Sequence, residues 1–415
     1  MRSLLRVFPN QFFAQLAILG LIVGLVTSKV VLSVATIMLL CNALINIRIG
    51  RNFKTWLSDP TSLLLMAVFL IYLFSGFWSQ DTAYWVDRCR MKLPFLALPL
   101  GFTTVRALTK RDFHRWLGIY VIVIAGTAVV MLINYLAHYT ELNHQLTMGQ
   151  PIPAPLRDHI RFSLELAFAI IVAGYLWKEK YFFCTPRERP LWGAVALFLL
   201  VCIHVFAVRS GILTLYLALA VVLLHQAFTL KKYIPAMAGI AGLIAAGYLS
   251  TQYIPSLKAR MDYFRYEMRL IRHGQINADH SDAQRILSMQ YGLTVAKQQP
   301  VIGVGAGDIR NAMVDLYTQH AQNETVKSKM PHNQYIYFLA ATGIIGLIIF
   351  LLSALYPWLS RHRYRNMLYT VFMLMMLFAC MAEHTLEIQL GTAYYLVFLL
   401  LIKKYIDDNA RPQNA

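Results

Sequence analysis

The chain has 415 residues, of which 58% are hydrophobic and only 14% are charged, and its formal net charge is +18. Soluble domains carry about 25% charged residues, so this composition, with a mean hydropathy of +0.52, excludes a soluble globular protein. The five cysteines have no CxxC spacing and indicate neither a metal site nor a disulfide framework.

Apolar segments recur along the whole chain at lengths suited to crossing a bilayer. Helices satisfy their own backbone hydrogen bonds, which the bilayer interior requires, and about 20 apolar residues span the hydrocarbon core. The first segment follows Arg2 and Arg6 like a signal peptide, but no small-residue cleavage site follows it, so we interpret it as a span. We therefore predict an all-α, polytopic membrane protein in which residues 1–415 form a single integral membrane domain. About twelve transmembrane helices are expected, near residues 11–28, 30–47, 61–78, 93–106, 115–137, 162–177, 191–207, 211–228, 233–250, 334–356, 367–382 and 390–403.

Basic residues in the connecting segments indicate an orientation. Lys and Arg concentrate in short cytoplasmic loops. When both termini are placed in the cytoplasm, every loop on the cytoplasmic side is basic. The basic residues of that set are Arg48, Arg51, Lys54, Arg106, Lys110, Arg111, Arg115, Lys178, Lys180, Arg187, Arg189, Lys231, Lys232, Arg361, Arg363, Arg365, Lys403 and Lys404.

On the outer face, four basic clusters stand at or just before helices that run inward. Each such helix points the positive end of its dipole outward, and arginines beside helix N-termini bind phosphate groups. Two explanations remain open: the side chains extend to lipid head groups, or they bind an anionic ligand. The presence of four such clusters on one face favours the anionic ligand. The clusters are Arg88, Arg90 and Lys92; Arg157 and Arg161; Arg209; and Lys327 with Lys329.

One large hydrophilic stretch, residues 251–333, is expected on the outer side between the ninth and tenth spans. Ser281-Asp282-Ala283-Gln284 fits a capping box and predicts a helix that ends near Gln298. The turn from Gly303 to Asp308 is rich in glycine but has no flanking strands, so we predict a tight turn packed against a helix rather than a dinucleotide site. The stretch has a mild positive balance, which suits either an acidic lipid or a solvated surface.

His332 opens the tenth span. The positive end of the helix dipole, together with Lys327 and Lys329, disfavours a proton on its imidazole. A neutral histidine at an aqueous site can take a proton from a hydroxyl group, as a general base does. The alternative is a capping or interface histidine without chemistry. The arginines on the same outer face favour the general base.

Four motifs carry a resemblance to a known family: RDHIRFS at 157–163, VRSG at 208–211, PVIGVGAGD at 300–308 and PHNQYIYFLAATGIIGLIIF at 331–350. In this order they resemble the O-antigen ligase and O-antigen polymerase superfamily over residues 155 to 355. The most specific part joins His332 and Asn333 to Gly343 and Gly346. The resemblance implies a glycosyltransferase C-like fold whose large, mostly helical loop at 251–333 is periplasmic.

The resemblance also implies a function in lipopolysaccharide biosynthesis at the bacterial inner membrane. A metal-independent, inverting transferase, without a cofactor or a nucleic-acid partner, would act among membrane lipids on the periplasmic side. It would move a glycan from undecaprenyl pyrophosphate onto a sugar hydroxyl of lipid A–core oligosaccharide. His332 matches the family's base, and Arg161, Arg209 and, less securely, Arg285 match the arginines that would hold the pyrophosphate and stabilise its developing charge.

Further residues are candidates for binding substrate. His159 lies beside Arg161, and Asn333 follows the proposed base. Glu383 ends the eleventh span together with His384 and Glu387, and an acidic residue at a membrane interface is a functional candidate. We predict that Glu383 orients His332 or an arginine.

Two alternatives to an O-antigen ligase remain open. The first is an O-antigen polymerase or another lipid-linked glycan transferase of the superfamily; a single dominant outer loop and an intact histidine motif favour the ligase. The second is a lipid or polysaccharide transporter, which predicts charged residues within spans, broken helices and an internal repeat. The sequence has few such charges and no clear repeat, so this alternative is less favoured.

Overall fold

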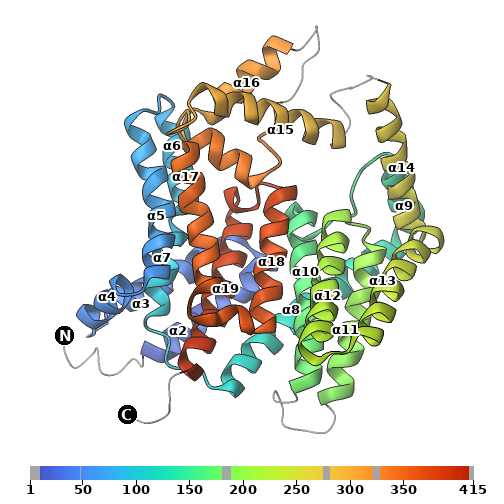
Figure 1. The fold of residues 1–415 in the computed structure, drawn as a ribbon, viewed down its shortest axis with the longest axis horizontal. Helices are drawn as coiled ribbons and strands as arrows, with labels where there is room; N and C mark the ends of the chain where they lie inside the picture. The colour runs from blue at the N-terminus through green and yellow to red at the C-terminus, as the bar shows by residue number, and fades with distance from the viewer. Residues whose placement is uncertain (1–9, 47, 180–187, 274–280, 321–327, 411–415) are drawn as a thin grey trace. The chain divides into compact units, whose positions relative to one another are not determined.

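The computed structural model describes residues 10–46, 48–179, 188–273, 281–320 and 328–410. Within these ranges every regular element is helical (Figure 1), which confirms the all-α prediction. The helices are α2 (Asn10–Thr27), α3 (Lys29–Leu44), α4 (Ile49–Leu57), α5 (Pro60–Phe74), α6 (Thr82–Lys92), α7 (Pro94–Phe102), α8 (Lys110–Ala137), α9 (Tyr139–Thr147), α10 (His159–Glu179), α11 (Glu188–Val205), α12 (Arg209–Leu230), α13 (Tyr233–Tyr253), α14 (Pro255–Arg272), α15 (Ser281–Gln298), α16 (Ile309–His320), α17 (Gln334–Leu359), α18 (Met367–Ala382) and α19 (Gln389–Ala410). Short 3₁₀ turns are η1 (Ser75–Phe77), η2 (Pro155–Arg157), η3 (Ser360–Arg365) and η4 (Thr385–Glu387).

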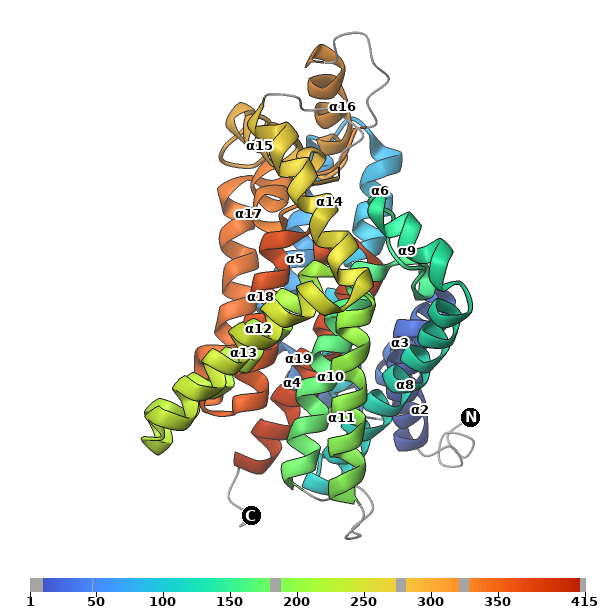
Figure 2. The same cartoon turned by 90° about the vertical axis from the view of Figure 1, so that its right-hand side faces the viewer.

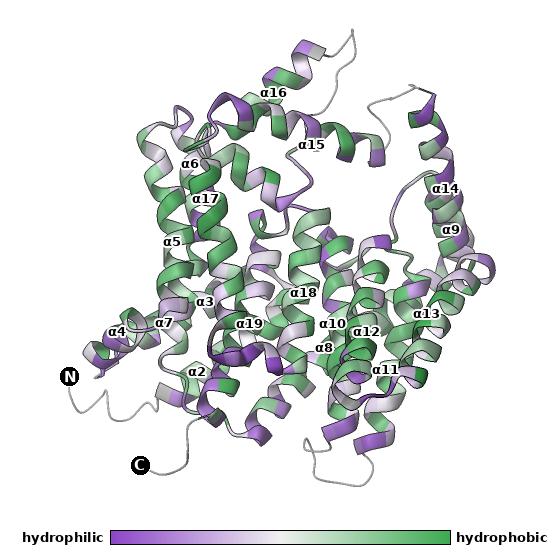
Figure 3. Cartoon of the chain, viewed as in Figure 1, coloured by the Kyte–Doolittle hydropathy of each residue, from purple (hydrophilic) through white to green (hydrophobic). Residues whose placement is uncertain are grey.

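Each of the twelve expected spans overlaps a helix, and the long helices are coloured predominantly hydrophobic in Figure 3. Among the described residues, seven helices are long and apolar enough to cross a membrane, and the bent pair α3 and α4 can count as an eighth. α2 and α18 are apolar but shorter. The chain is therefore a multi-pass helical membrane protein, and the count of twelve stays a prediction. The seven are α8, α10, α11, α12, α13, α5 extended by η1, and α17 extended by η3.

The fourth expected span, 93–106, differs from the prediction. Its helix α7 has nine residues, which at 1.5 Å per residue is too short to cross a hydrocarbon core. Pro94 begins the helix and Pro99 lies inside it. Proline lacks the N–H that a continuous helix needs, so the segment is separated from α6 instead of forming one long span.

The contacts of the chain divide it into two compact units. Unit 1 consists of Met1–Thr109, Gln284–Arg365 and Cys380–Ala415, and unit 2 of Lys110–Ala283 and Asn366–Ala379. In unit 1, α5 packs against α6, α7 and α17, and α19 packs against α2 and α7. In unit 2, α10 packs against α8, α11 and α12, while the more polar α14 packs against α9 and α13 (Figure 2).

The glycine-rich turn from Gly303 to Asp308 packs into a break in α17. Gly343 has φ +65° there, a conformation that residues with a Cβ rarely adopt, and a Cβ at this position would strike the backbone of Val301. The N–H groups of Val304 and Gly305 donate hydrogen bonds of 3.0 Å to carbonyl groups of α17. These contacts confirm that the turn packs against a helix.

Asp308 fixes the same turn to the segment before α6. Its carboxylate accepts hydrogen bonds from the backbone N–H groups of Gln80, at 2.8 and 3.0 Å, and of Asp81, at 2.8 Å. A carboxylate that accepts several N–H groups makes strong, charge-assisted bonds. The turn therefore connects α5, α6 and α17, and the principal candidate residue lies just before the N-cap of α17.

Candidate functional site

His332 lies immediately before α17, and its neighbour Asn333 fixes where that helix begins. The Asn333 side-chain oxygen accepts hydrogen bonds from the N–H groups of Tyr335 and Ile336, at 3.0 and 3.1 Å, as an N-cap does. Its amide nitrogen donates to the carbonyl of Met381 at 3.0 Å, which ties α17 to the end of α18. Asn333 therefore has a structural role, and the predicted contact with substrate stays a prediction.

Ser288, a fully buried residue of α15, holds the imidazole of His332. Its hydroxyl donates to the carbonyl of Arg285 at 2.8 Å, which uses its single proton. The same oxygen accepts from the backbone N–H of His332 at 3.2 Å and lies 3.0 Å from His332 Nδ1. With the hydroxyl proton directed to the Arg285 carbonyl, this contact requires the proton of the imidazole to be on Nδ1. That tautomer leaves Nε2 as the basic nitrogen of the ring.

Arg285 lies one turn before Ser288 on α15 and forms an ion pair at the same end of α17. Its Nη2 donates to Glu383 Oε1 at 2.6 Å, and the Glu383 side chain is 3% exposed whereas that of Arg285 is 30% exposed. The guanidinium thus has one side held by a buried carboxylate and another accessible. His384 follows Glu383, and its ring meets that of His332 edge to face, with 5.5 Å between centroids.

A buried network connects the starts of α17 and α19 next to this site. Glu387 Oε1 accepts from Lys92 Nζ at 2.6 Å, from Gln334 Nε2 at 2.7 Å and from Tyr72 at 2.8 Å. The oxygen of the Gln334 amide accepts from the backbone N–H of Leu386 at 2.7 Å. A buried ion pair of this kind requires such additional hydrogen bonds to offset desolvation. The network holds the segment carrying Glu383 and His384 against the first turn of α17.

The outer basic cluster of Arg88, Arg90 and Lys92 was predicted as a possible site for an anion, and the structure corrects this for Lys92. Its side chain is fully buried and pairs with Glu387, so it is not accessible to a ligand. Arg88 donates to Asp87 at 2.6 Å and to the Glu387 carbonyl at 3.2 Å. The sequence did not reveal Glu387 as a partner because it lies about 300 residues away along the chain.

In unit 2, Arg161 is a buried arginine whose guanidinium is only partly paired. It is only 7% exposed, and its Nη1 lies 3.5 Å from Asp158 Oδ1. Its Nε and Nη2 are buried and have no hydrogen-bond partner among the described residues. Buried polar groups are almost always paired, and an anion that fits a guanidinium fork would satisfy both atoms.

The motif containing Arg209 adjoins the motif containing Arg161. A Cβ at Gly211, near the start of α12, would contact the Ser163 side chain, at 2.5 Å from its Cβ. Arg209 Nη2 donates to both oxygens of Asp282, at 2.8 Å each, and its guanidinium lies 4.8 Å from the centre of the Phe264 ring. Arg209 is thus held by a carboxylate and an aromatic face, an arrangement typical of positioned guanidinium groups.

The α14 helix places a second acidic group next to Asp282. Burial, followed by a hydrogen bond and charge repulsion from Asp282, raises the pKa of Glu267 above its ordinary value. Burial and the neighbouring Arg209 lower the pKa of Arg260, which also donates to the carbonyl of Gly149. Protonation of Glu267 is therefore favoured, because a second carboxylate next to that of Asp282 would be repelled.

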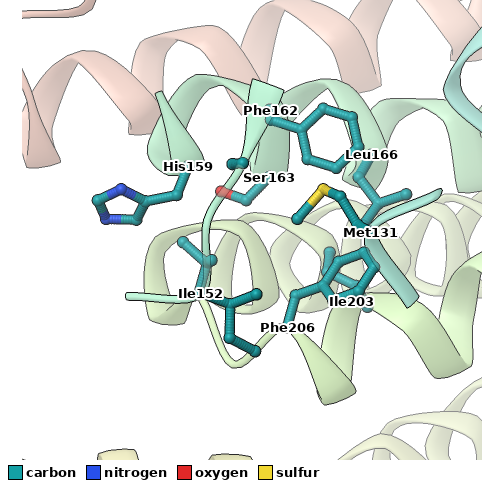
Figure 4. A pocket seen from close by; sticks show the side chains of 10 residues that line it. Met131, Ile152, His159, Phe162, Ser163, Leu166, Ile203 and Phe206 are labelled. Atoms are coloured by element: carbon teal, nitrogen blue, oxygen red, sulfur yellow. The ribbon is translucent and has the colours of Figure 1, made fainter. Parts of the chain in front are cut away.

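His159 begins α10 and borders an apolar pocket in unit 2. Met131, Phe162, Leu166 and Phe206 contribute to its lining, and Figure 4 shows the His159 ring pointing away from these apolar side chains. The enclosed space is about 10 Å³, at most one water molecule. This pocket cannot hold a sugar, so the predicted contact between His159 and substrate would have to lie on the other side of the ring.

The structure groups the predicted residues by unit. Unit 1 brings together Arg285, Glu383, Asn333 and His332, and unit 2 contains Arg161, Arg209 and His159. Glu383 forms an ion pair with Arg285, as expected of a group that orients an arginine, and its role at the site stays a prediction. Lys327 lies outside the described residues.

Sequence reasoning missed Ser288 and the function of Asp282 as the partner of Arg209. The available signal was helical spacing, because Ser288 follows Arg285 by three residues and therefore lies on the same face of α15. Its contact with His332, 44 residues away, appears only in the tertiary structure.

A family model described as O-antigen ligase matches residues 193–351. The match includes Arg209, Arg285, Ser288, His332 and Asn333. The match over residues 193–351 agrees with the superfamily that the motifs predicted, and this family implies an enzyme that transfers lipid-linked glycans. No curated protein matches the chain.

Proposed function

We propose that the protein is an O-antigen ligase. It transfers a glycan from undecaprenyl pyrophosphate to a hydroxyl of the lipid A–core oligosaccharide, at the periplasmic side of the bacterial inner membrane. The family domain supports the reaction class. The observation that carries the proposal is the 3.0 Å contact between the buried Ser288 hydroxyl and His332 Nδ1, which supports Nε2 as the basic nitrogen.

In the proposed reaction, His332 Nε2 removes the proton from the acceptor hydroxyl as its oxygen attacks the anomeric carbon of the donor sugar. The bond from that carbon to the pyrophosphate oxygen breaks, and its electron pair leaves with undecaprenyl pyrophosphate. Attack on the opposite face from the leaving group inverts the anomeric configuration. General-base catalysis of this kind contributes about 10² to 10⁴ in rate.

Arginines stabilise the charge that develops on the leaving pyrophosphate. Arg161 offers two buried nitrogen groups that no described residue uses, and part of Arg285 is exposed beyond its bond to Glu383. Asp282 orients the guanidinium of Arg209 for the same role. Fixed cations of this type act where charge grows in the transition state and require no rearrangement at that moment.

The test of the proposal is a deletion strain complemented with His332→Ala. We expect polymer to remain on undecaprenyl pyrophosphate and capped lipopolysaccharide to be lost, whereas wild-type protein restores it. His362→Ala is a matched control because His362 is an exposed histidine in η3. Single repeat units attached to core in the deletion strain would identify a polymerase instead. Normal amounts of capped lipopolysaccharide with His332→Ala, at equal protein level, would refute the role of His332 as the general base.

A further inference from the structure

Unit 1 contains a cavity of about 290 Å³ beside the proposed base. His384 lines it, and the His384 ring is the one that contacts His332. Small-molecule sites commonly measure roughly 300–1,000 Å³, so the cavity has the size for one compact group. A long chain would not fit.

The lining combines charged groups with apolar surface. Five of the nine lining side chains are charged, amide or imidazole groups, including Arg88, Glu387 and Gln389, and a lipid tail would leave them without hydrogen bonds. Most of the accessible wall is apolar, and Met91 and Met330 contribute to it. This mixture of hydrogen-bonding groups and apolar wall matches a sugar ring, which has hydroxyl groups at its edge and C–H groups on its faces.

The charges in the lining are mostly balanced, which argues against a phosphate group. Arg88 is paired with Asp87 at 2.6 Å, and Glu387 with Lys92 at 2.6 Å. A phosphate would also meet the Glu387 carboxylate, whose Oε2 is buried and has no hydrogen-bond partner in the part of the chain described here. A hydroxyl group can donate to such an oxygen, whereas a phosphate would be repelled.

We propose that this cavity binds a neutral sugar of the acceptor next to the hydroxyl that His332 deprotonates. The assignment rests on the proposed function, in which the base acts on the acceptor. None of the three arginines that match the family's pyrophosphate site lines the cavity. The cavity therefore belongs to the acceptor side of the reaction and selects the sugar that receives the glycan.

The test fills the cavity and compares the two substrates. Met91→Trp places an indole in the space. Val86→Trp is the matched control, because Val86 lies on the same helix, is 56% exposed and does not line the cavity. With purified enzyme in nanodiscs, Met91→Trp should raise the apparent KM for lipid A–core on the order of tenfold or more. The KM for the lipid-linked donor should stay within about twofold. Equal acceptor KM values for Met91→Trp and Val86→Trp would overturn the proposal.

A binding experiment separates failure of this proposal from failure of the proposed function. Saturation-transfer NMR uses core oligosaccharide freed from lipid A as the probe, so it requires no turnover. We expect signal with the wild-type protein and its loss with Met91→Trp or, if that variant does not fold, with Met330→Trp. Loss of the signal on addition of inorganic pyrophosphate would assign the cavity to the donor, and absence of any signal would refute a sugar site. A wild-type protein that binds the oligosaccharide but transfers nothing would refute the ligase alone.

Discussion

Replacement of Ser288 by alanine tests how the site prepares its base. The hydroxyl accepts a hydrogen bond from the backbone N–H of His332 and contacts Nδ1 of its imidazole at 3.0 Å. Without it, the ring loses the contact that selects the Nδ1–H tautomer. One hydrogen bond contributes a net 0.5–1.5 kcal/mol, roughly. If all of this free energy stabilises the transition state and not the bound substrates, its loss should lower kcat roughly 2- to 12-fold.

The assay follows transfer of glycan from the lipid-linked donor to lipid A–core with purified protein. We expect Ser288→Ala to lower kcat while both KM values stay near wild type, because the serine touches the base and neither substrate. Thr294→Ala is the matched control. Thr294 lies on the same helix and its exposed hydroxyl bonds only the Gln290 carbonyl, at 3.1 Å. A kcat equal to that of Thr294→Ala, or a change confined to KM, would refute the reasoning.

Three further predictions concern the charged groups. Arg161→Ala should raise the donor KM roughly tenfold or more, because a charged hydrogen bond to phosphate is lost. Arg90→Ala removes an exposed arginine and should leave the donor KM unchanged. Equal effects of the two substitutions would mean that Arg161 has only a structural role. The raised pKa of Glu267 means that the folded protein favours its protonated form, so thermal stability should fall as pH rises from about 4.5 through that raised pKa. Glu267→Gln should weaken the dependence of the melting temperature on pH. An unchanged dependence would mean that another group is responsible for it. Activity should persist in excess EDTA, because the arginines supply the positive charge; loss that added Mg²⁺ reverses would contradict this.

Several features of the fold were predictable because they depend on local composition. The helical segments follow from long apolar stretches, since a helix satisfies its own backbone in lipid. The helix over 281–298 was predicted from its capping pattern and is confirmed as α15. The short α7 was mistaken for a full span because hydropathy does not register the effect of Pro94 and Pro99 on helix length.

The site was partly predictable for the same reason. His332 could be identified from one segment, as a histidine at the mouth of an apolar helix. Its partner could not, because a serine within a helix has no distinguishing local signal. Lys92 shows the opposite error: a basic residue at a helix end suggested an accessible cation, but Glu387 neutralises it inside unit 1.

By itself, the sequence determined the helical membrane class, the resemblance to the family and the candidate residues of the site. The tertiary structure decided which groups share hydrogen bonds: Ser288 with His332, Arg285 with Glu383, and Arg209 with Asp282. The physical reason is that the two kinds of feature depend on different neighbours. Helix formation and membrane insertion depend on neighbours along the chain, whereas a tautomer or an ion pair depends on atoms within about 3 Å. The chain brings those atoms together from positions 44 to 98 residues apart.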